Sequence, residues 1–410
     1  MTQVPVSVVV VSRDRPDALM RCLTGLSQLQ YPNFEIVVVA DRKGDIAVSR
    51  SAFSDQIKQV LFDRANISEA RNIGVSHAAG DVVAFIDDDA VPEPSWLTQL
   101  VAPSGRSDVA AMGGYVRGRN GISYQWKARS VDARGDFTDL DMNPKRATIL
   151  TPKGRRAIKT EGTNMAVRRD VLVELEGFDP GFAFYLDETD LNLRLCRAGY
   201  ATAIVPMAEV HHGYAASPRR RADRVPRDLY DIGSSWAVFQ RKYLSVTERP
   251  DHWRAIRKHE WTRLVRYMTA GVLEPRTLRH LMSRLDIGYG QGIGRQRGGG
   301  QVTRSPISAF KRFPFKARTS VVLSGRTWQR KTLRAEASER SAAGQIVTLV
   351  LLSPTSFYHT VRFDPAGYWE QRGGLFGKSL RDDPPVRVTS FASRVEREVR
   401  RVAAQRTIDD

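Results

Sequence analysis

Three consecutive carboxylates follow a short apolar run, and their spacing points to cation chemistry. Asp87, Asp88 and Asp89 come directly after residues 82–86, which have the composition of a buried strand. Two carboxylates 4 Å apart repel each other by about 1 kcal/mol in water, and by more where solvent is reduced. A divalent cation would relieve this repulsion, and oxygen ligands favour Mg²⁺ or Mn²⁺. The sequence therefore predicts a cation site, with Asp87 and Asp89 on one side of an extended chain; a solvated acidic turn is the alternative.

A second acidic group opens an amphipathic helix predicted at about 188–198. Asp187, Glu188 and Asp190 follow an aromatic segment at 182–185. Acidic side chains in a first helical turn interact favourably with the helix dipole, by roughly 0.3–1 kcal/mol each, so helix capping is one interpretation. The other is catalytic, because a carboxylate beside an apolar wall has a raised proton affinity and can serve as a general base.

Two smaller groups lie near predicted strands. Histidine is a common metal ligand, so one of His211 and His212 is a candidate to complete the site that Asp89 begins. Asn164 stands in a strand-like segment, where the nearby Gly162 leaves room for a ligand to approach. A purely structural role is the alternative for both groups.

An α/β fold must position these residues, and the first 210 residues predict one. Continuous β-branched runs indicate strands buried on both faces, and segments of helical period separate them. This alternation predicts right-handed crossovers and a mostly parallel sheet. Ligands bind at the carboxyl ends of the strands in such sheets, and both Asp41 and the acidic triplet at 87–89 fall there. The predicted strands cover 6–11, 34–40, 60–62 and 82–86, and the predicted helices cover 18–29 and 68–79.

The pattern changes further along the chain. Residues 116–160 are polar and have little periodicity, which predicts a flexible loop or flap. Beyond residue 217 the α/β alternation stops, segments of helical period dominate, and a glycine-rich stretch at 288–300 indicates a loop. We therefore predict a catalytic domain at 1–217 and a basic, largely helical region at 218–410 with a mixed α/β end. Later predicted elements are strands at 161–167 and 201–205 and helices at 170–176, 229–243, 253–268, 276–285 and 393–404.

Basic residues are concentrated in one block of the chain. Residues 211–340 hold 28 Lys and Arg against 10 Asp and Glu, whereas residues 1–210 hold 25 against 27. Such a block favours a polyanionic partner or an anionic membrane surface; an Arg-rich helical region with no special partner is the alternative. Its mixture of arginine and tryptophan also suits nucleic acid. Because the first half of the chain contains the acidic sites, we interpret the basic block as binding a membrane surface or a polyanionic acceptor rather than nucleic acid.

Other features exclude several classes of protein. Two cysteines, Cys22 and Cys196, are too few for a disulfide scaffold, and neither lies in a Cys/His cluster of the kind that binds structural zinc. No apolar run approaches the roughly 20 residues of a membrane-spanning helix. Residues 1–3 lead directly into a strand pattern, without the features of a signal peptide. We expect a cytoplasmic protein that attaches peripherally to a membrane through its basic block.

In their order along the chain, these residues resemble the family 2 glycosyltransferases, which have the GT-A fold, a Rossmann-like sheet flanked by helices. The resemblance covers residues 5–213 and depends on the series of motifs rather than on any single one. It implies an inverting enzyme that moves a sugar from a nucleotide-diphosphate donor, most simply a UDP-sugar, to a carbohydrate or lipid-linked acceptor. Cell-surface polysaccharide or glycolipid synthesis is the implied setting. The motifs are Ser12-Arg13-Asp14-Arg15-Pro16, Glu35-Ile36-Val37-Val38-Val39-Ala40-Asp41, Ala70-Arg71-Asn72-Ile73-Gly74, Gly80-Asp81, Phe85-Ile86-Asp87-Asp88-Asp89-Ala90, Gly162-Thr163-Asn164-Met165-Ala166, Gly177-Phe178-Asp179, Asp187-Glu188-Thr189-Asp190-Leu191 and His211.

The resemblance also implies a role for each matching residue. Glu188 stands at the position of the catalytic base, and Asp187 is its partner in the acidic couple. Asp89, with Asp87 and His211, would hold the Mn²⁺ or Mg²⁺ that bridges the donor diphosphate. The implied acceptor-binding residues are Gly162 and Asn164, and the implied donor-binding residues are Ser12, Arg13, Asp41, Arg71, Asp87 and Asp88.

Two departures from the family pattern keep alternatives open. The usual Asp-Asp-Gly-Ser is Ala40-Asp41-Arg42-Lys43 here, so the nucleotide is not fixed, and the usual Glu-Asp couple is reversed, so either carboxylate is a candidate base. A sugar-phosphate nucleotidyltransferase uses similar carboxylates, but the glycine-rich, lysine-containing phosphate loop that it needs near the first strand is absent from the sequence. A non-catalytic protein that binds nucleotide-sugars or carbohydrates is the other alternative.

Overall fold

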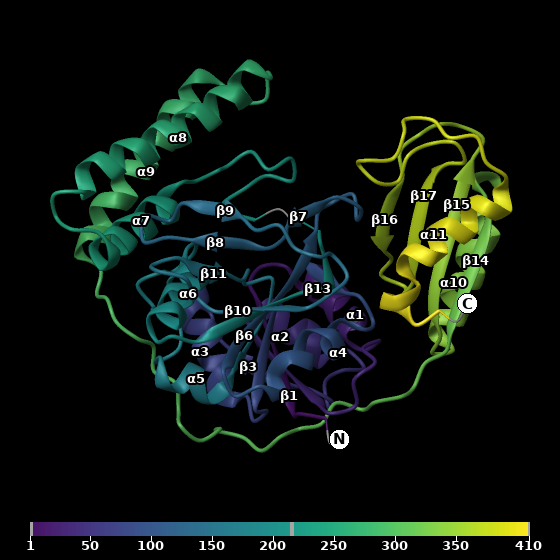
Figure 1. The fold of residues 1–410 in the computed structure, drawn as a ribbon, viewed down its shortest axis with the longest axis horizontal. Helices are drawn as coiled ribbons and strands as arrows, with labels where there is room; N and C mark the ends of the chain where they lie inside the picture. Colours follow the sequence, from purple (N-terminus) through teal and green to yellow (C-terminus); the bar gives the residue numbers. More distant parts are fainter. Residues whose placement is uncertain (1–2, 214–216, 409–410) are drawn as a thin grey trace.

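A ten-stranded, mostly parallel sheet forms the centre of the computed structural model, which describes residues 3–213 and 217–408 (Figure 1). One half contains the parallel strands β1 (Val6–Ser12), β2 (Phe34–Ala40), β3 (Lys58–Leu61) and β4 (Val82–Asp87). The other half contains β6 (Val109–Arg117), β12 (Asn164–Arg168) and β13 (Ala201–His212), with β5 (Ala90–Pro92), β7 (Tyr124–Trp126) and β10 (Thr148–Leu150) attached. The order is β10-β13-β6-β12-β4-β1-β2-β3, and β12 runs antiparallel between β4 and β6. The predicted fold class is confirmed.

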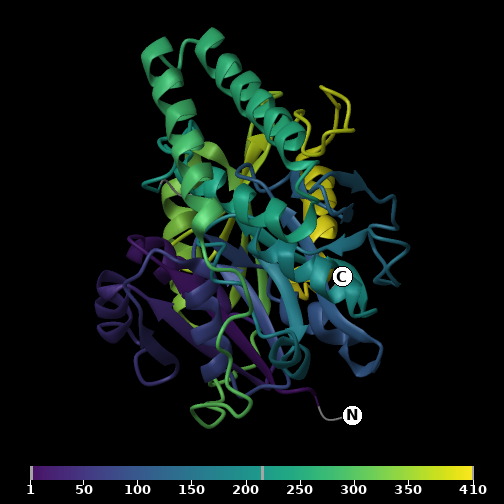
Figure 2. The same ribbon diagram turned by 90° about the vertical axis from the view of Figure 1, so that its left-hand side faces the viewer.

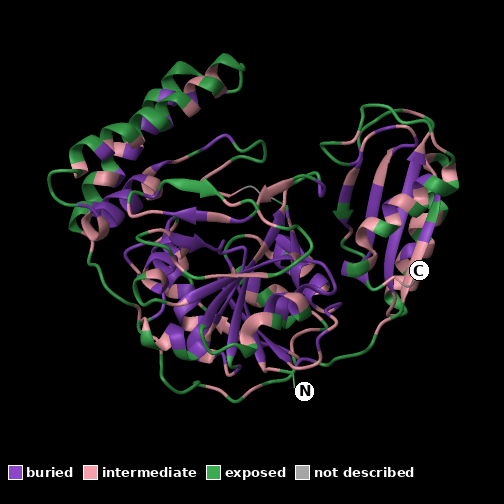
Figure 3. Cartoon of the chain, in the orientation of Figure 1, coloured by how far each residue is buried: buried purple, intermediate pink, exposed green. Residues whose placement is uncertain are grey.

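Helices cover both faces of this sheet, because successive side chains of a strand point to opposite faces. Val8 and Val10 of β1 lie in the same apolar cluster as Leu23, whereas Val9 lies in the cluster on the other face with Val75. The strands are consequently the most buried part of the molecule (Figure 3). The helices are α1 (Pro16–Leu26), α2 (Arg42–Ser49), α3 (Ile67–His77), α4 (Trp96–Val101), α5 (Arg169–Glu174) and α6 (Asp187–Arg197), and a 3₁₀ turn, η1 (Ala102–Gly105), follows α4.

The region predicted as a flexible loop contains short strands instead. In addition to β7 and β10, it forms a three-stranded antiparallel sheet of β8 (Arg129–Val131), β9 (Phe137–Asp139) and β11 (Ala157–Lys159). Strands of three residues are too short to show a period of two in the sequence. The prediction of a loop without regular secondary structure was therefore wrong. The segment does lie above the carboxyl edge of the central sheet, where a flap was predicted (Figure 1).

Three helices follow the first unit: α7 (Tyr230–Tyr243), α8 (Arg249–Thr269) and α9 (Pro275–Gly294). The last two form a hairpin that projects from the body (Figures 1 and 2). The predicted loop at 288–300 is wrong in its first half, because α9 continues through it. A Cβ at Gly288 would clash with the carbonyl oxygen of Tyr230 on α7, so glycine serves here for close helix packing and not for a turn.

A second, smaller sheet closes the chain. It has the order β14-β15-β17-β16, in which β14 (Ser320–Arg326), β15 (Ile346–Ser353) and β17 (Trp369–Gly374) are parallel and β16 (Thr360–Phe363) is antiparallel. A 3₁₀ turn, η2 (Thr327–Gln329), and α10 (Arg330–Ala342) follow β14, and α11 (Phe391–Arg406) ends the unit. The α/β alternation that was predicted to stop at residue 217 therefore resumes at residue 320. This agrees with the predicted mixed α/β end of the chain.

An extended segment, residues 295–319, joins the hairpin to this last unit along the first domain. Phe313 in this segment packs on Phe34, with ring centroids 5.3 Å apart, and its N–H donates to the Phe34 carbonyl at 2.8 Å. Among the residues described, no helix is both long and apolar enough to cross a membrane.

Candidate active site

Two neighbouring parallel strands, β1 and β4, bring polar residues to the carboxyl edge of the sheet. Ser12 ends β1, and its Oγ donates to Asp88 Oδ2 at 2.7 Å. Arg15, in the turn after β1, places Nη2 2.5 Å from Asp88 Oδ1. Burial raises the pKa of the Asp88 carboxyl to about 7, although Arg15 opposes this effect. Asp88 and Ser12 thus hold the edge together, and their donor-binding role stays a prediction.

Asp87, Asp89 and His212 form a cluster in which each residue offers one ligand atom within 4.8 Å of the others. His212 Nε2 lies 3.2 Å from Asp89 Oδ1. From the sequence, this place is predicted for His211, whereas in the structure His212 is the histidine beside Asp89. Because neighbouring residues of β13 point to opposite faces, His211 turns away and its Nε2 lies 2.8 Å from Glu93 Oε1.

Arginines surround this cluster and offset its charge. Arg15 Nη1 lies 3.2 Å from Asp89 Oδ2, and Arg220 Nη2 lies 3.6 Å from the same oxygen. Arg220 belongs to the predicted basic block, so part of that block lies at the site. Neither arginine was assigned a role from the sequence. Arg15 stands within the first quoted motif, but nothing in its spacing indicated a contact with residues more than 70 positions away.

Arg71, on α3, connects the two acidic groups. Its Nη1 pairs with Asp187 Oδ2, and its Nη2 lies 3.5 Å from Asp87 Oδ1. The side chain is buried. Burial by itself lowers the pKa of the guanidinium, but the neighbouring carboxylates outweigh this effect and raise the pKa. A Cβ at Gly162 would clash with Arg71, so Gly162 makes room for this arginine. Thr163 Oγ1 donates to Asp87.

The acidic couple stands at the start of α6, after two residues with left-handed backbone. Tyr185 has φ of 77° and Leu186 has φ of 68°, conformations that cost of order 1–3 kcal/mol each for residues other than glycine and cluster at functional sites. This turn fixes the direction of Asp187 and Glu188. Burial raises the pKa of Asp187 to about 7, against the opposing effect of Arg71.

Lys159, at the end of β11, lowers the pKa of Glu188, whereas the pKa of Asp187 is raised. Lys159 Nζ lies 2.9 Å from Glu188 Oε1 and 3.1 Å from Glu161 Oε2, and its side chain is 1% exposed. Burial alone would raise the pKa of Glu188, but the ammonium group holds it at about 2. Glu161 also pairs with Arg129 of β8. Sequence reasoning missed Lys159, because it lies on a three-residue strand inside the segment predicted as a loop.

Two other predicted donor-binding residues, Asp41 and Arg13, make hydrogen bonds within the fold. Asp41 caps α2, accepting from the Gly44 N–H through Oδ1 and from the Asp14 N–H through Oδ2, both at 2.9 Å. Arg13 is half-exposed and donates to the Asp63 carbonyl at 2.7 Å. Their donor-binding roles stay predictions.

Asn164 does not reach the site. It is fully buried; its amide donates to the Tyr115 and Ala208 carbonyls at 2.9 and 2.8 Å, and its Oδ1 accepts from Trp96 Nε1 at 2.8 Å. These bonds connect β12 to β6, β13 and α4. The polar atoms of Asn164 therefore serve the fold, and its acceptor-binding role stays a prediction.

A parallel sheet that gathers carboxylates, an imidazole and arginines at its carboxyl edge is typical of enzymes that bind phosphorylated ligands with a cation. The family model described as "Glycosyltransferase like family 2" matches residues 4–230, more than half of the chain. The chain therefore belongs to this family of glycosyltransferases.

Individual proteins and one solved structure are similar to this chain. The chain is 28% identical over 250 residues to the O-antigen biosynthesis protein RfbC of Myxococcus xanthus, covering 57% of this chain and 19% of that protein. It is 26% identical over 203 residues to the glycosyltransferase AglE of Haloferax volcanii, covering 48% of this chain and 62% of that one. The match thus spans less than two thirds of either relative. A solved structure of GalNAc-T7 with UDP, GalNAc and Mn²⁺ has a TM-score of 0.43 and 20% identity, covering 61% of this chain and 54% of that one.

Proposed function

We propose that this chain is an inverting, cation-dependent glycosyltransferase that moves a sugar from a nucleotide-diphosphate sugar, in the first instance a UDP-sugar, to an acceptor hydroxyl. The observation that carries the proposal is Arg71, which contacts Asp187 and lies 3.5 Å from Asp87. A donor held at the acidic triplet is thereby within reach of the couple at 187–188. The name of RfbC supports a carbohydrate or lipid-linked acceptor in cell-surface polysaccharide or glycolipid synthesis.

The residues at the sheet edge fit a divalent cation. Asp87, Asp89 and His212 offer two carboxylate oxygens and one imidazole nitrogen. Carboxylates suit Mg²⁺ and Mn²⁺, and an imidazole suits transition metals, so this donor set favours Mn²⁺. A cation bound there would neutralise the negative charge that develops on the departing nucleoside diphosphate. Arg71 and Arg15 add positive charge at the same edge.

Glu188 is the proposed general base. Its side chain is 19% exposed, whereas that of Asp187 is 3% exposed and is paired with Arg71. Lys159 keeps Glu188 ionised at neutral pH. The low pKa of Glu188 makes it a weak base, so it takes the proton as the bond to the anomeric carbon forms and makes the acceptor hydroxyl strongly acidic. The acceptor hydroxyl gives its proton to Glu188 while its oxygen forms a bond to the anomeric carbon. The bond from that carbon to the diphosphate oxygen breaks, and the nucleoside diphosphate leaves from the opposite face.

The test is nucleotide release from a panel of sugar nucleotides with Mn²⁺, with and without added acceptors. Glu188→Gln keeps the shape of the side chain but removes the base, so we expect turnover to fall by about 10²–10⁴-fold while UDP still binds. Turnover of Glu188→Gln equal to that of the wild type would exclude this residue as the base. No release from any donor would favour a non-catalytic binding protein.

A further inference from the structure

The exposed apolar side chains of the small C-terminal unit gather at one end of its sheet. Trp328 follows β14, Phe357 and Tyr358 follow β15, and three more follow β17. Because β14, β15 and β17 are parallel, their carboxyl ends lie at the same edge. We call this set the apolar rim. Its members are Trp328, Phe357, Tyr358, Leu380, Val386 and Val388, all between 40% and 90% exposed, and they include every large apolar side chain found exposed in residues 320–408.

Basic residues accompany the rim. Trp328, Arg330 and Lys331 line a hollow of about 370 Å³ together with Thr327. Lys378 Nζ lies 5.0 Å from the centre of the Tyr358 ring. An aromatic ring beside two cations is a combination that suits an anionic headgroup, because the ring packs on its apolar part while the cations bind the phosphate.

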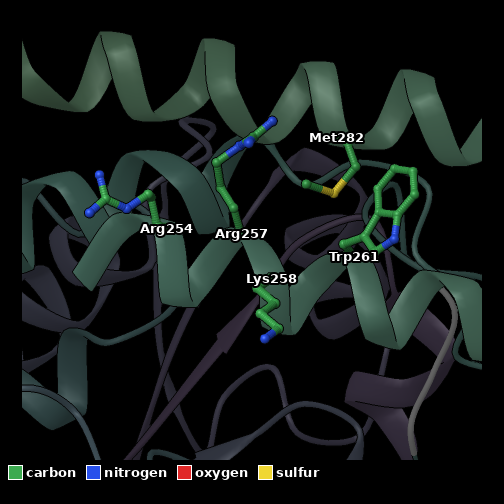
Figure 4. A pocket seen from close by; sticks show the side chains of 5 residues that line it. All are labelled: Arg254, Arg257, Lys258, Trp261 and Met282. Atoms are coloured by element: carbon green, nitrogen blue, oxygen red, sulfur yellow. The ribbon is translucent and has the colours of Figure 1, made fainter. Parts of the chain in front are cut away.

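The α8–α9 hairpin presents the same chemistry. A second hollow, of about 320 Å³, lies along it and is lined by Arg254, Arg257, Lys258, Trp261 and Met282 (Figure 4). Trp261 is 48% exposed. Figures 1 and 2 show that the hairpin and the loops carrying the rim extend on the same side of the molecule, beyond the short strands above the active site. Two separate elements therefore present tryptophan and cations in one direction.

From this arrangement we infer that the apolar rim and the hairpin bind together to the surface of an anionic lipid bilayer. Trp328 lies on the 3₁₀ turn η2 and the other rim side chains lie on loops; exposed side chains of this kind insert between headgroups. Cations near the surface add about a five-fold gain in binding each. The inference deepens the proposed function, since a membrane surface would present a lipid-linked acceptor to the site. It differs from the sequence prediction in its location, because most of the rim lies beyond the basic block at 211–340.

The experiment is flotation of the full chain with vesicles of phosphatidylcholine, alone or mixed with phosphatidylglycerol. We expect salt-sensitive binding to the mixed vesicles. Trp328→Ser/Phe357→Ser/Val388→Ser should lower it by about ten-fold or more, and Arg330→Gln/Lys331→Gln by about five-fold for each cation. The matched control Leu61→Ser/Val246→Ser removes two apolar side chains that are 55% and 72% exposed elsewhere, and it should bind as the wild type does.

Absence of the wild type from floated anionic vesicles at low salt would overturn the inference. Equal binding by the rim variant and the control would overturn the location. A finding that a soluble polysaccharide or a protein, and not the vesicles, covers Trp328 would also overturn it. Mn²⁺-dependent UDP release in solution is measured on the same variants. The rim variants should retain it, so a failure of membrane binding remains distinct from a failure of the proposed function.

Discussion

Replacement of Lys159 by methionine tests how the structure sets the protonation of the proposed base. Lys159 is the cation that holds the pKa of Glu188 at about 2, below its ordinary 4.5. Without it, the largest effect that opposes burial is lost and the pKa of Glu188 rises. At about 1.4 kcal/mol for each pKa unit, the wild-type shift corresponds to about 3 kcal/mol of net stabilisation of the ionised carboxylate, to which Lys159 is the largest favourable contributor. We also expect a stability loss of about 3–5 kcal/mol, because carboxylates stay buried without their partner.

The assay is the pH dependence of kcat/KM. Wild-type Glu188 is ionised above about pH 2, so it contributes no acid limb near pH 4.5, whereas in Lys159→Met the raised pKa brings protonation of Glu188 toward that range. The ratio of mutant to wild-type kcat/KM should therefore fall between pH 7 and pH 4.5. Asp187, whose pKa is about 7, interacts directly with Glu188, so the ratio reports the shift of the acidic couple as a whole.

The matched control for this experiment is Lys58→Met. Lys58 Nζ forms a buried pair with Glu35 Oε2 at 2.8 Å, away from the site. This control should lose comparable stability and keep a flat ratio. A flat ratio for folded Lys159→Met would refute the reasoning, because either Glu188 is not the base or Lys159 does not set its protonation. Recovery of the low-pH activity by Lys159→Arg would support it.

Two further predictions concern the supporting structure. Gly288→Ala should destabilise the protein by about 1–3 kcal/mol, because the added Cβ would clash with the Tyr230 carbonyl oxygen. Gly290→Ala, in open space on the same helix, should stabilise the protein by about 1 kcal/mol. Chemical denaturation that ranks the two variants the other way would contradict the packing. Arg406→Met should cost about 3–5 kcal/mol, because Arg406 pairs with buried Glu93 through two contacts of 2.9 Å. Arg400→Met, exposed on the same helix, should cost under about 0.5 kcal/mol, and equal melting temperatures for the two arginine variants would count against a docked C-terminal unit.

The parts of the molecule that sequence predicted well are those with local signals. The β-branched runs at 6–11 and 34–40 became β1 and β2, and the acidic triplet lies at the predicted sheet edge. Which of His211 and His212 lies beside Asp89 could not be predicted, because it depends on which face of β13 each residue occupies. The face that each histidine occupies follows from the pairing of β13 with β6 and β5. The irregularity between Val205 and Glu209 interrupts the alternation along β13, so this face cannot be predicted from the sequence.

Residues that act through long-range contacts were missed. Lys159 reaches Glu188 across 29 positions, and Arg15 reaches Asp88 across 73, so neither has a periodic or motif signal. The glycines of α9 indicated a loop because glycine usually breaks helices, whereas close packing against α7 gives Gly288 another use. Asn164 matched its motif correctly, but its hydrogen bonds to Tyr115 and Ala208 depend on the assembled sheet.

Calorimetric titration of UDP tests the central claim most directly, namely that Asp87, Asp89 and His212 hold a cation that binds the donor diphosphate. With Mn²⁺ present, we expect the wild type and His211→Asn to bind UDP with similar affinity. His212→Ala should lose about ten-fold or more of that affinity, and removal of Mn²⁺ should bring the wild type down to the same level. Unchanged affinity in His212→Ala, or wild-type binding that does not depend on Mn²⁺, would contradict the account.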